Sequence, residues 1–196
     1  MIKFEKVKKF KDVEFEMPHR KTANSAGYDM VVAEDTVIPP YNELMAQFDL
    51  AMLRENPEPA GDLYTYIDEK EHHSKYYTLA DIANVTKKSG AKPTLVSTGV
   101  KAYMSPDMYL ELSVRSSCPL KHWIIMANSV GIIDADYADN PDNEGEIFFQ
   151  LINLSTVPIL LKKGDVIGQG IFKRYLKTND DNATAERVGG FGSTSV

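Results

Sequence analysis

The stretch GIIDADY, residues 131–137, continues an apolar strand pattern and then adds two carboxylates and a tyrosine. We expect its first half to form a buried strand. An unpaired buried carboxylate costs on the order of several kcal/mol, so Asp134 and Asp136 each need a partner or a chemical role. For Asp136 we favour a structural role, in a salt bridge or a turn hydrogen bond. Tyr137 is either a core aromatic residue or a flat surface for a ligand.

Short strand patterns lie on both sides of this stretch. Apolar and polar residues alternate in each of them, as they do in half-buried strands, and Gly, Pro, Asn and Asp mark the breaks. Regular short strands separated by such turns predict an all-β barrel or sandwich. The expected strands lie within residues 1–10, 13–17, 92–104, 108–117, 123–134, 145–155 and 157–176, and a further short strand is expected between Gly27 and Pro39.

Residues 43–92 have a different pattern and predict a small helical insertion in one domain that spans residues 1–196. Four apolar residues recur at helical spacing and can share one face: Leu44, Phe48, Ala51 and Met52. A second helix is predicted further on, with Thr78 as its N-cap and Gly90 as its stop. The insertion is either a surface elaboration or an element that binds a protein partner.

Bulk composition limits the class of protein. With 196 residues and 43% hydrophobic content, one domain with a sizeable core is expected. The net charge of −6 argues against a constitutive nucleic-acid binder, although a nucleotide site needs only a few local cations. The single cysteine, Cys118, excludes an intrachain disulfide framework. Without an apolar run of about 18 residues or a signal-peptide pattern, we expect a cytoplasmic protein with no membrane contact.

The C-terminal segment RVGGFGSTS, residues 187–195, has the composition of an anion-binding arm. Its glycines allow backbone N–H groups to approach an anion, and Arg187 offers a fork that suits phosphate oxygens. Phe191 offers a face on which a base can stack. The alternative is the end of a disordered linker. In either case the polar, glycine-rich residues 178–196 predict a flexible arm.

Three further polar segments each carry a weak signal. In VRSSCPLK, residues 114–121, Arg115 with Ser116 and Ser117 can clamp phosphates, although a strand end with a capping serine is the commoner case. In KGDVIGQG, residues 163–170, a turn precedes Gln169, the residue there that suits a ligand. The segment NSAGYDM, residues 24–30, is a turn that places Asp29 near the start of a strand.

Together these segments are more specific than any of them alone. The order SAGYD, RSS, N-x-VGIIDADY, GDVIGQ and RVGGFGSTS resembles the five ordered motifs of the trimeric dUTPase family. The resemblance runs from about residue 17 to the C-terminus, with residues 43–92 as an interruption. It implies a dUTPase-like jelly-roll or β-barrel, a homotrimer, and hydrolysis of dUTP to dUMP and diphosphate.

The resemblance also implies roles for individual residues. Asp134 would activate the attacking water, and Tyr137 would lie under the deoxyribose and leave no space for a 2′-hydroxyl. Asn128 and the backbone of residues 131–133 would form a β-hairpin that reads the uracil edge, and Phe191 would stack on the base. The residues expected to contact the substrate are Arg115, Ser116, Ser117, Asn128, Gly131, Ile132, Ile133, Tyr137, Phe148, Gln169, Arg187, Phe191, Gly192 and Ser193.

For the metal, the resemblance implies Mg²⁺ held mainly by the triphosphate, with Asp29 near the metal-bound waters and no direct protein ligand. The four histidines show no metal-binding spacing. The resemblance implies in addition that three subunits share each site. One would provide Asp134, a second would provide Asp29, Arg115 and Gln169, and the third would provide the arm.

Two departures from the family pattern concern the site. An acidic loop, residues 138–144, separates Tyr137 from the Gly145–Glu146 pair and is expected near the sugar. The arm has one residue fewer than usual between Arg187 and Phe191. Two alternatives remain: a dCTP deaminase of the same fold, with Glu146 as the acid–base residue, and a nucleotide-gated binding protein that uses the 43–92 insertion. The aspartate–tyrosine pair favours hydrolysis.

Overall fold

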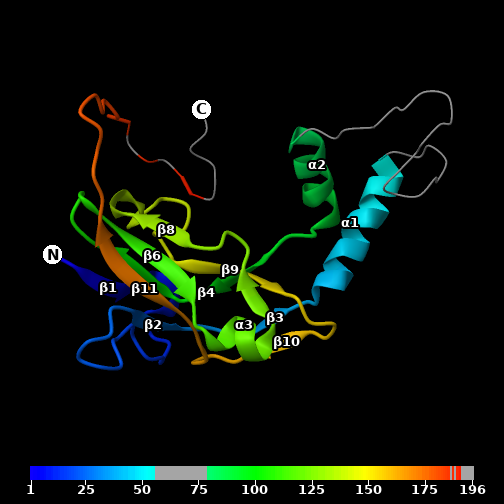
Figure 1. The fold of residues 1–196 in the computed structure, drawn as a ribbon, viewed down its shortest axis with the longest axis horizontal. Coiled ribbons are helices and arrows are strands. Elements are labelled where there is room, and N and C mark those ends of the chain that lie inside the picture. Colours follow the sequence, from blue (N-terminus) through cyan, green and yellow to red (C-terminus); the bar gives the residue numbers. More distant parts are fainter. Residues whose placement is uncertain (56–78, 186, 188, 191–196) are drawn as a thin grey trace.

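A computed structural model describes residues 1–55, 79–185, 187, 189 and 190 (Figure 1). The strands are β1 (Lys3–Lys6), β2 (Tyr28–Val31), β3 (Thr36–Ile38), β4 (Thr94–Ser97), β5 (Val100–Tyr103), β6 (Met108–Val114), β7 (Ile124–Met126), β8 (Gly131–Asp134), β9 (Phe148–Asn153), β10 (Ile159–Leu161) and β11 (Val166–Arg174). The α-helices are α1 (Tyr41–Glu55), α2 (Leu79–Ser89) and α3 (Ser117–His122), and the 3₁₀ turns are η1 (Lys8–Phe10) and η2 (Ala135–Tyr137). The prediction of a mostly β fold is confirmed.

Antiparallel pairing organises the strands into two main sheets and two ribbons. The larger sheet has the order β2-β11-β6-β8, and the smaller sheet has the order β4-β9-β7. The ribbons pair β1 with β5 and β10 with β3. Strand β8 therefore lies at an edge of the larger sheet, and β6 is hydrogen-bonded on both of its sides.

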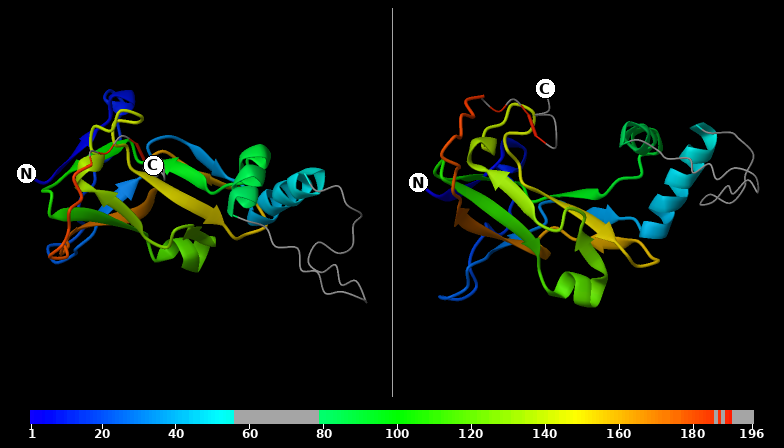
Figure 2. Two further views of the ribbon diagram at one scale, coloured as in Figure 1. Left: turned by 90° about the horizontal axis from the view of Figure 1, so that it is seen from above. Right: turned by 45° about the horizontal axis from the view of Figure 1, so that its top comes forward.

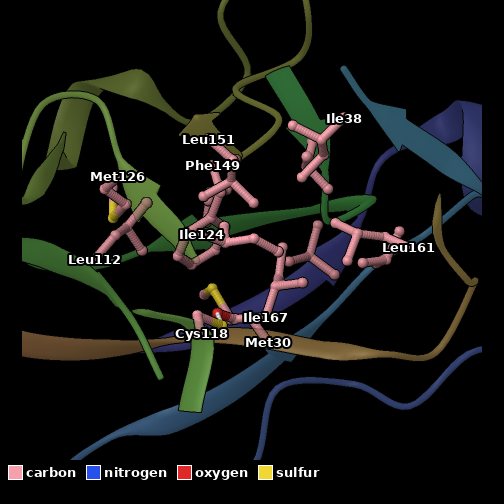
Figure 3. Packing of buried hydrophobic residues seen from close by; sticks show 14 of the residues in the cluster. Met30, Ile38, Leu112, Cys118, Ile124, Met126, Phe149, Leu151, Leu161 and Ile167 are labelled. Carbon is pink, nitrogen blue, oxygen red and sulfur yellow. Dashed lines mark hydrogen bonds between the residues drawn. The ribbon is translucent and has the colours of Figure 1, made fainter. Parts of the chain in front are cut away.

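The main core lies where the inner faces of the sheets meet (Figure 3). Buried and half-buried residues alternate along β6 and β9, which is the period of two that the sequence predicts for half-buried strands. Leu112 of β6 and Ile167 of β11 contribute from the larger sheet, while Phe149 of β9 and Ile124 of β7 contribute from the smaller one (Figure 3). This packing holds the two sheets at a fixed separation.

Gly168 of β11 lies against Phe149 of the other sheet. It follows an irregularity in the register of β11 with β2. A Cβ atom at this position would lie 2.2 Å from Cε1 of Phe149 and 2.8 Å from the carbonyl oxygen of Ser113. The position therefore requires glycine because a methyl group would overlap with the Phe149 ring.

The helical insertion lies to one side of the β body, beyond β3 and β4 and away from β8 (Figures 1 and 2). The predicted apolar face of α1 is confirmed, because all four of its residues are partly buried: Leu44, Phe48, Ala51 and Met52. Gly90 ends α2 with a φ of 69°, and its N–H donates to the Thr86 carbonyl at 2.9 Å. The predicted N-cap, Thr78, lies outside the described residues. No helix in the described ranges is long and apolar enough to cross a membrane.

The sequence predicted a uracil-reading β-hairpin at residues 128–133, and the strand pairing that such a hairpin requires is wrong. Strand β7 pairs with β9, whereas β8 pairs with β6, so residues 127–130 carry the chain from one sheet to the other. Trp123, expected on a strand, has a φ of 55° and ends the short helix α3. Alternation along the chain predicted that these segments were strands but contained no information about their partners.

We predict that Gly168→Ala lowers the free energy of unfolding by about 1–3 kcal/mol, because the added methyl group overpacks the core against Phe149. Denaturant unfolding at one fixed protein concentration measures the loss. Phe149→Leu removes the ring atoms that the methyl group would meet. The double variant should therefore lose less stability than the sum of the single variants, and simple additivity would contradict the proposed overlap.

Candidate active site

A hollow of about 180 Å³ opens beside the end of β8, and we call it the Asp134 hollow. Its lining includes eight residues that the sequence predicted as site residues: Asn128, Gly131, Ile132, Ile133, Asp134, Tyr137, Phe148 and Arg187. The other lining residues are Leu112, Glu146, Gln150 and Gly190. Strand β8, the turn before it and the start of β9 thus bring one group of predicted residues together.

The carboxylate of Asp134 is not buried in the single chain, and the expectation of a buried strand here is wrong. The Asp134 side chain is 51% exposed, and its neighbour Ile132 is also 51% exposed. The physical reason is that β8 lies at the sheet edge, where no further strand covers it. Any dehydration of this carboxylate must come from a ligand or from another chain.

Arg187 bridges the two carboxylates of the opening stretch. Its Nη2 donates to Oδ2 of Asp134, and its Nε donates to Oδ1 of Asp136 at 2.8 Å. The predicted salt bridge of Asp136 is therefore confirmed. Burial alone would lower the pKa of Arg187, but the hydrogen bond to Asp136 and the charges of both aspartates raise it above its ordinary value. In the single chain, this arginine neutralises carboxylates instead of facing an open phosphate site.

Tyr137 is the buried wall of the Asp134 hollow, with 6% of its surface exposed. Burial raises the pKa of its hydroxyl, which accepts a hydrogen bond from Nδ2 of Asn143 at 2.7 Å. The Arg187 guanidinium lies over the ring, 5.8 Å from its centroid. A Cβ atom on Gly190 would lie 2.8 Å from Cε2 of the ring. The C-terminal segment of the same chain therefore covers the tyrosine.

Glu146, the candidate acid–base residue of a deaminase, is buried at the back of the hollow. Burial raises the pKa of its carboxyl group, while hydrogen bonds from the Ser97 hydroxyl and the Gly99 backbone oppose that effect. Ser97 ends β4 in the smaller sheet. These contacts tie the Glu146 carboxylate to β4 and to the turn that follows it.

A second group of predicted residues lies across β2, β11 and β6. Gln169 is directly opposite Asp29 on one side and Ser113 on the other, and its Nε2 is 3.4 Å from the Ser113 hydroxyl. A Cβ atom on Gly27 would lie 2.1 Å from Oε1 of Gln169. Among the described residues, Oδ2 of Asp29 is buried without a hydrogen-bond partner. This unpaired oxygen is available to a cation or to a metal-bound water.

The predicted phosphate clamp lies at the junction of β6 and α3. Arg115 and Ser116 are exposed, and Ser117 is half-buried in the first position of the helix. Ser116 is the N-cap residue, but its side chain makes no capping hydrogen bond, so the structural alternative for this serine is wrong. Its hydroxyl is free for a ligand.

The single chain does not unite the two groups. Asp134 is opposite Tyr109 in the pairing of β8 with β6, and Arg115 is six positions further along (115 − 109). At about 3.3 Å per residue, Asp134 and Arg115 lie on the order of 20 Å apart along the sheet. Three predicted residues, Phe191, Gly192 and Ser193, lie outside the described residues.

The sequence predicted the acidic loop near the sugar and an arm that includes Gly190, but not the contacts that these segments make. The bond from Asn143 to Tyr137 joins the acidic loop to the site, and Gln150 and Gly190 complete the lining. In the described part of the chain, no group of three or more His, Cys, Asp or Glu side chains is placed to hold a metal ion. Oxygen atoms of Asp29 and Asp134 remain the candidate contacts for a hard cation and its waters.

An edge-strand carboxylate beside a buried tyrosine, with the exposed Arg115 and Ser116 beyond the end of β6, is an arrangement that suits a nucleotide. The model of the dUTPase family matches residues 13–61 and 66–195, so this chain belongs to the dUTPase family.

Relatives with known names agree with this membership. The deoxyuridine 5′-triphosphate nucleotidohydrolase of Lactococcus lactis subsp. lactis is 32% identical over 195 residues, which cover 98% of this chain and 97% of that protein. The crystal structure of the dUTPase from Streptococcus mutans has a TM-score of 0.61 and 31% identity, over 90% of this chain and 98% of that one. The dUTPase of S. aureus phage phi11 has a TM-score of 0.53 over 98% and 99% of the two chains, and at 13% identity it supports the fold alone.

We predict that Asp136→Asn exposes the peptide bond after Arg187 to trypsin. The lost ion pair, with the Asp136 side chain 60% exposed, contributes at most about 1 kcal/mol, so cleavage should become up to about five-fold faster. Mass spectrometry of timed digests measures the rate, and cleavage after Lys177 provides an internal reference. Asp142→Asn removes the same charge from a residue that forms no described hydrogen bond with Arg187. Equal rates in the two variants would contradict the bridge.

Proposed function

We propose that this protein hydrolyses dUTP to dUMP and diphosphate. The observation that carries the proposal is the pairing of Asp134 with Tyr137 in one hollow, next to Asn128 and the backbone of β8. Membership of the dUTPase family supports it, and so do relatives named for hydrolysis of deoxyuridine triphosphate. The same names do not favour the alternative of a nucleotide-gated binding protein.

In the proposed reaction, a water molecule attacks the α-phosphorus in line with the α,β-bridging oxygen. Asp134 accepts the proton of that water, the phosphorus–oxygen bond breaks, and diphosphate leaves. Arg187 holds one oxygen of this carboxylate in the single chain. The arm must therefore release Asp134 before turnover, and Arg187 becomes free to contact phosphate oxygens.

The hollow also supports selection of the nucleotide. Tyr137 is buried and provides a flat wall at which a 2′-hydroxyl would find no space. Asn128 and the backbone around Gly131 also line the hollow and can read the edge of the base. Glu146 is tied to Ser97 and to the Gly99 backbone, which argues against its use as the acid–base residue of a deaminase.

We also propose that the reaction uses Mg²⁺. The unpaired buried oxygen of Asp29 fits this ion, because protein-bound Mg²⁺ keeps several waters and binds to one or two carboxylates together with substrate phosphates. When bound, Mg²⁺ would offset the negative charge that develops on the triphosphate. Asp29 itself would orient metal-bound water, and Gln169 beside it would contact the phosphates.

The separation of the two groups along β6 supports a site shared between subunits of a homotrimer. Arg115, Ser116, Gln169 and Asp29 of one subunit would face Asp134 and Tyr137 of another, because one chain holds Arg115 on the order of 20 Å from Asp134 along β6. The exposed edge at Asp134 would then be covered by the neighbouring subunit and the nucleotide. The arm of the third subunit would close the site.

We expect Mg²⁺-dependent release of diphosphate from dUTP, and much slower release from dTTP, dCTP and UTP. Asp134→Asn should bind dUTP but turn over about 10²–10⁴-fold more slowly, because a positioned general base contributes that much to the rate. Initial rates and nucleotide binding are measured side by side on both proteins. Turnover within a few-fold of the parent would show that another group activates the water, and comparable rates on UTP would remove the role of Tyr137.

A mixing experiment tests the shared site. Asp134→Asn and Arg115→Ala, each of low activity, should complement each other when co-expressed, with roughly a quarter of the sites intact if subunits mix freely in a closed ring. Arg115→Ala mixed with Gln169→Ala is the matched control, because both residues would come from the same subunit and no intact pair can form. Mixed trimers are confirmed by mass. If activity recovers in neither mixture, the whole site lies in one chain.

A further inference from the structure

The acidic loop, residues 138–144, contacts the far end of the Tyr137 side chain through one residue. Nδ2 of Asn143 donates to the Tyr137 hydroxyl at 2.7 Å. Oδ1 of the same amide accepts the backbone N–H of Gly145 at 3.0 Å. Because the oxygen is used by Gly145, the orientation of the amide is determined, and its NH₂ group is the part that faces the tyrosine.

The two ends of the loop are held by β5 and by η1. Asp139 forms an ion pair with the buried amine of Lys101, and it accepts a hydrogen bond from the Tyr103 hydroxyl at 2.9 Å. Burial alone would lower the pKa of Lys101, but its contacts with Asp139 and Tyr103 raise it. Glu144 accepts the backbone N–H of Lys8 at 2.8 Å. These contacts make the loop a fixed support.

The loop also passes close to the backbone of Tyr137. Asp139 and Glu144 adopt positive φ values of 62° and 60°, and the Asp139 N–H donates to the Glu144 carbonyl at 3.0 Å. Gly145 has a φ of 77°, and a Cβ atom there would lie 2.2 Å from the Tyr137 carbonyl oxygen. The end of the loop therefore lies against the backbone of Tyr137, the residue whose side chain Asn143 contacts.

We propose that Asn143 is a positioning residue that holds the Tyr137 ring in the position at which the ring excludes a ribose 2′-hydroxyl. The inference rests on the proposed function. The hydroxyl is the end of the ring furthest from the backbone, so a bond there limits tilting of the ring most strongly. Recognition groups must be held to within about 0.5 Å by supporting hydrogen bonds, and an added hydroxyl is larger than that tolerance. Asn143 is thus the residue of the 138–144 loop that takes part in specificity.

The test is the ratio of kcat/KM for dUTP to that for UTP. Asn143→Ala removes the donor, and we expect the ratio to fall about five-fold through a gain on UTP, as expected for the loss of one hydrogen bond. Asp142→Asn is the matched control, because it alters the same loop without a hydrogen bond to Tyr137, and its ratio should equal that of the parent. Thermal unfolding of each variant shows that it is folded.

A double-mutant cycle separates positioning from a general effect on the fold. In a Tyr137→Phe background the hydroxyl is absent, so Asn143→Ala should leave the ratio unchanged. Asn143→Asp should restore most of the parent ratio, because a carboxylate can accept both the Gly145 N–H and the Tyr137 O–H. An unchanged ratio in folded Asn143→Ala, or an equal effect in both backgrounds, would overturn the inference. A parent protein that does not hydrolyse dUTP would instead overturn the proposed function.

Discussion

Strand β6 is hydrogen-bonded to β8 along one edge and to β11 along the other, and this double pairing fixes the position of the candidate site residues. Asp134 is opposite Tyr109, and Gln169 is opposite Ser113. A shift of one residue in either register would turn every side chain to the other face of the sheet. The buried side chains of Leu110 and Leu112 prevent such a shift, because they must remain in the core. Core packing and site geometry are therefore set by the same strand.

The same registers separate opposite charges. Asp134 lies opposite Tyr109, near the start of β6, while Arg115 follows the other end of that strand. In the single chain, Arg187 of the C-terminal segment forms ion pairs with both Asp134 and Asp136. A triphosphate and the two carboxylates would compete for the same Arg187 guanidinium. We therefore expect Arg187 to leave the aspartates and contact the triphosphate when the nucleotide binds. Because the pairs are partly exposed, such an exchange has a small energetic cost.

Tyr137 connects three separate parts of the chain. The acidic loop holds its hydroxyl through Asn143, the arm covers its ring at Gly190, and β8 leads directly into it. The loop is in turn fastened to η1 and β5 by Lys8 and Lys101. A change in η1 or β5 can therefore reach Tyr137, the wall of the hollow, through a short series of hydrogen bonds and ion pairs.

The sequence by itself determined the features that depend on neighbouring residues. Alternation predicted the half-buried strands, Gly90 predicted the end of α2, and the two aspartates within residues 131–137 predicted a salt bridge or a turn hydrogen bond for Asp136. The motif order predicted most of the residues that line the Asp134 hollow. Only the tertiary structure decided that β7 and β8 join different sheets, that Asp134 lies at an exposed edge, and that Arg187 reaches it from 53 positions away.

Even the short-range bond between Asn143 and Tyr137 needed the whole fold. The two residues are six positions apart, but the loop between them takes its shape from positive φ values and from Glu144, which meets Lys8 across 136 positions. Spacing in a sequence encodes the period of a strand or helix, because that period is a property of the local backbone. It does not encode which distant strand or charge will be the partner, because that choice is made by packing over the whole chain.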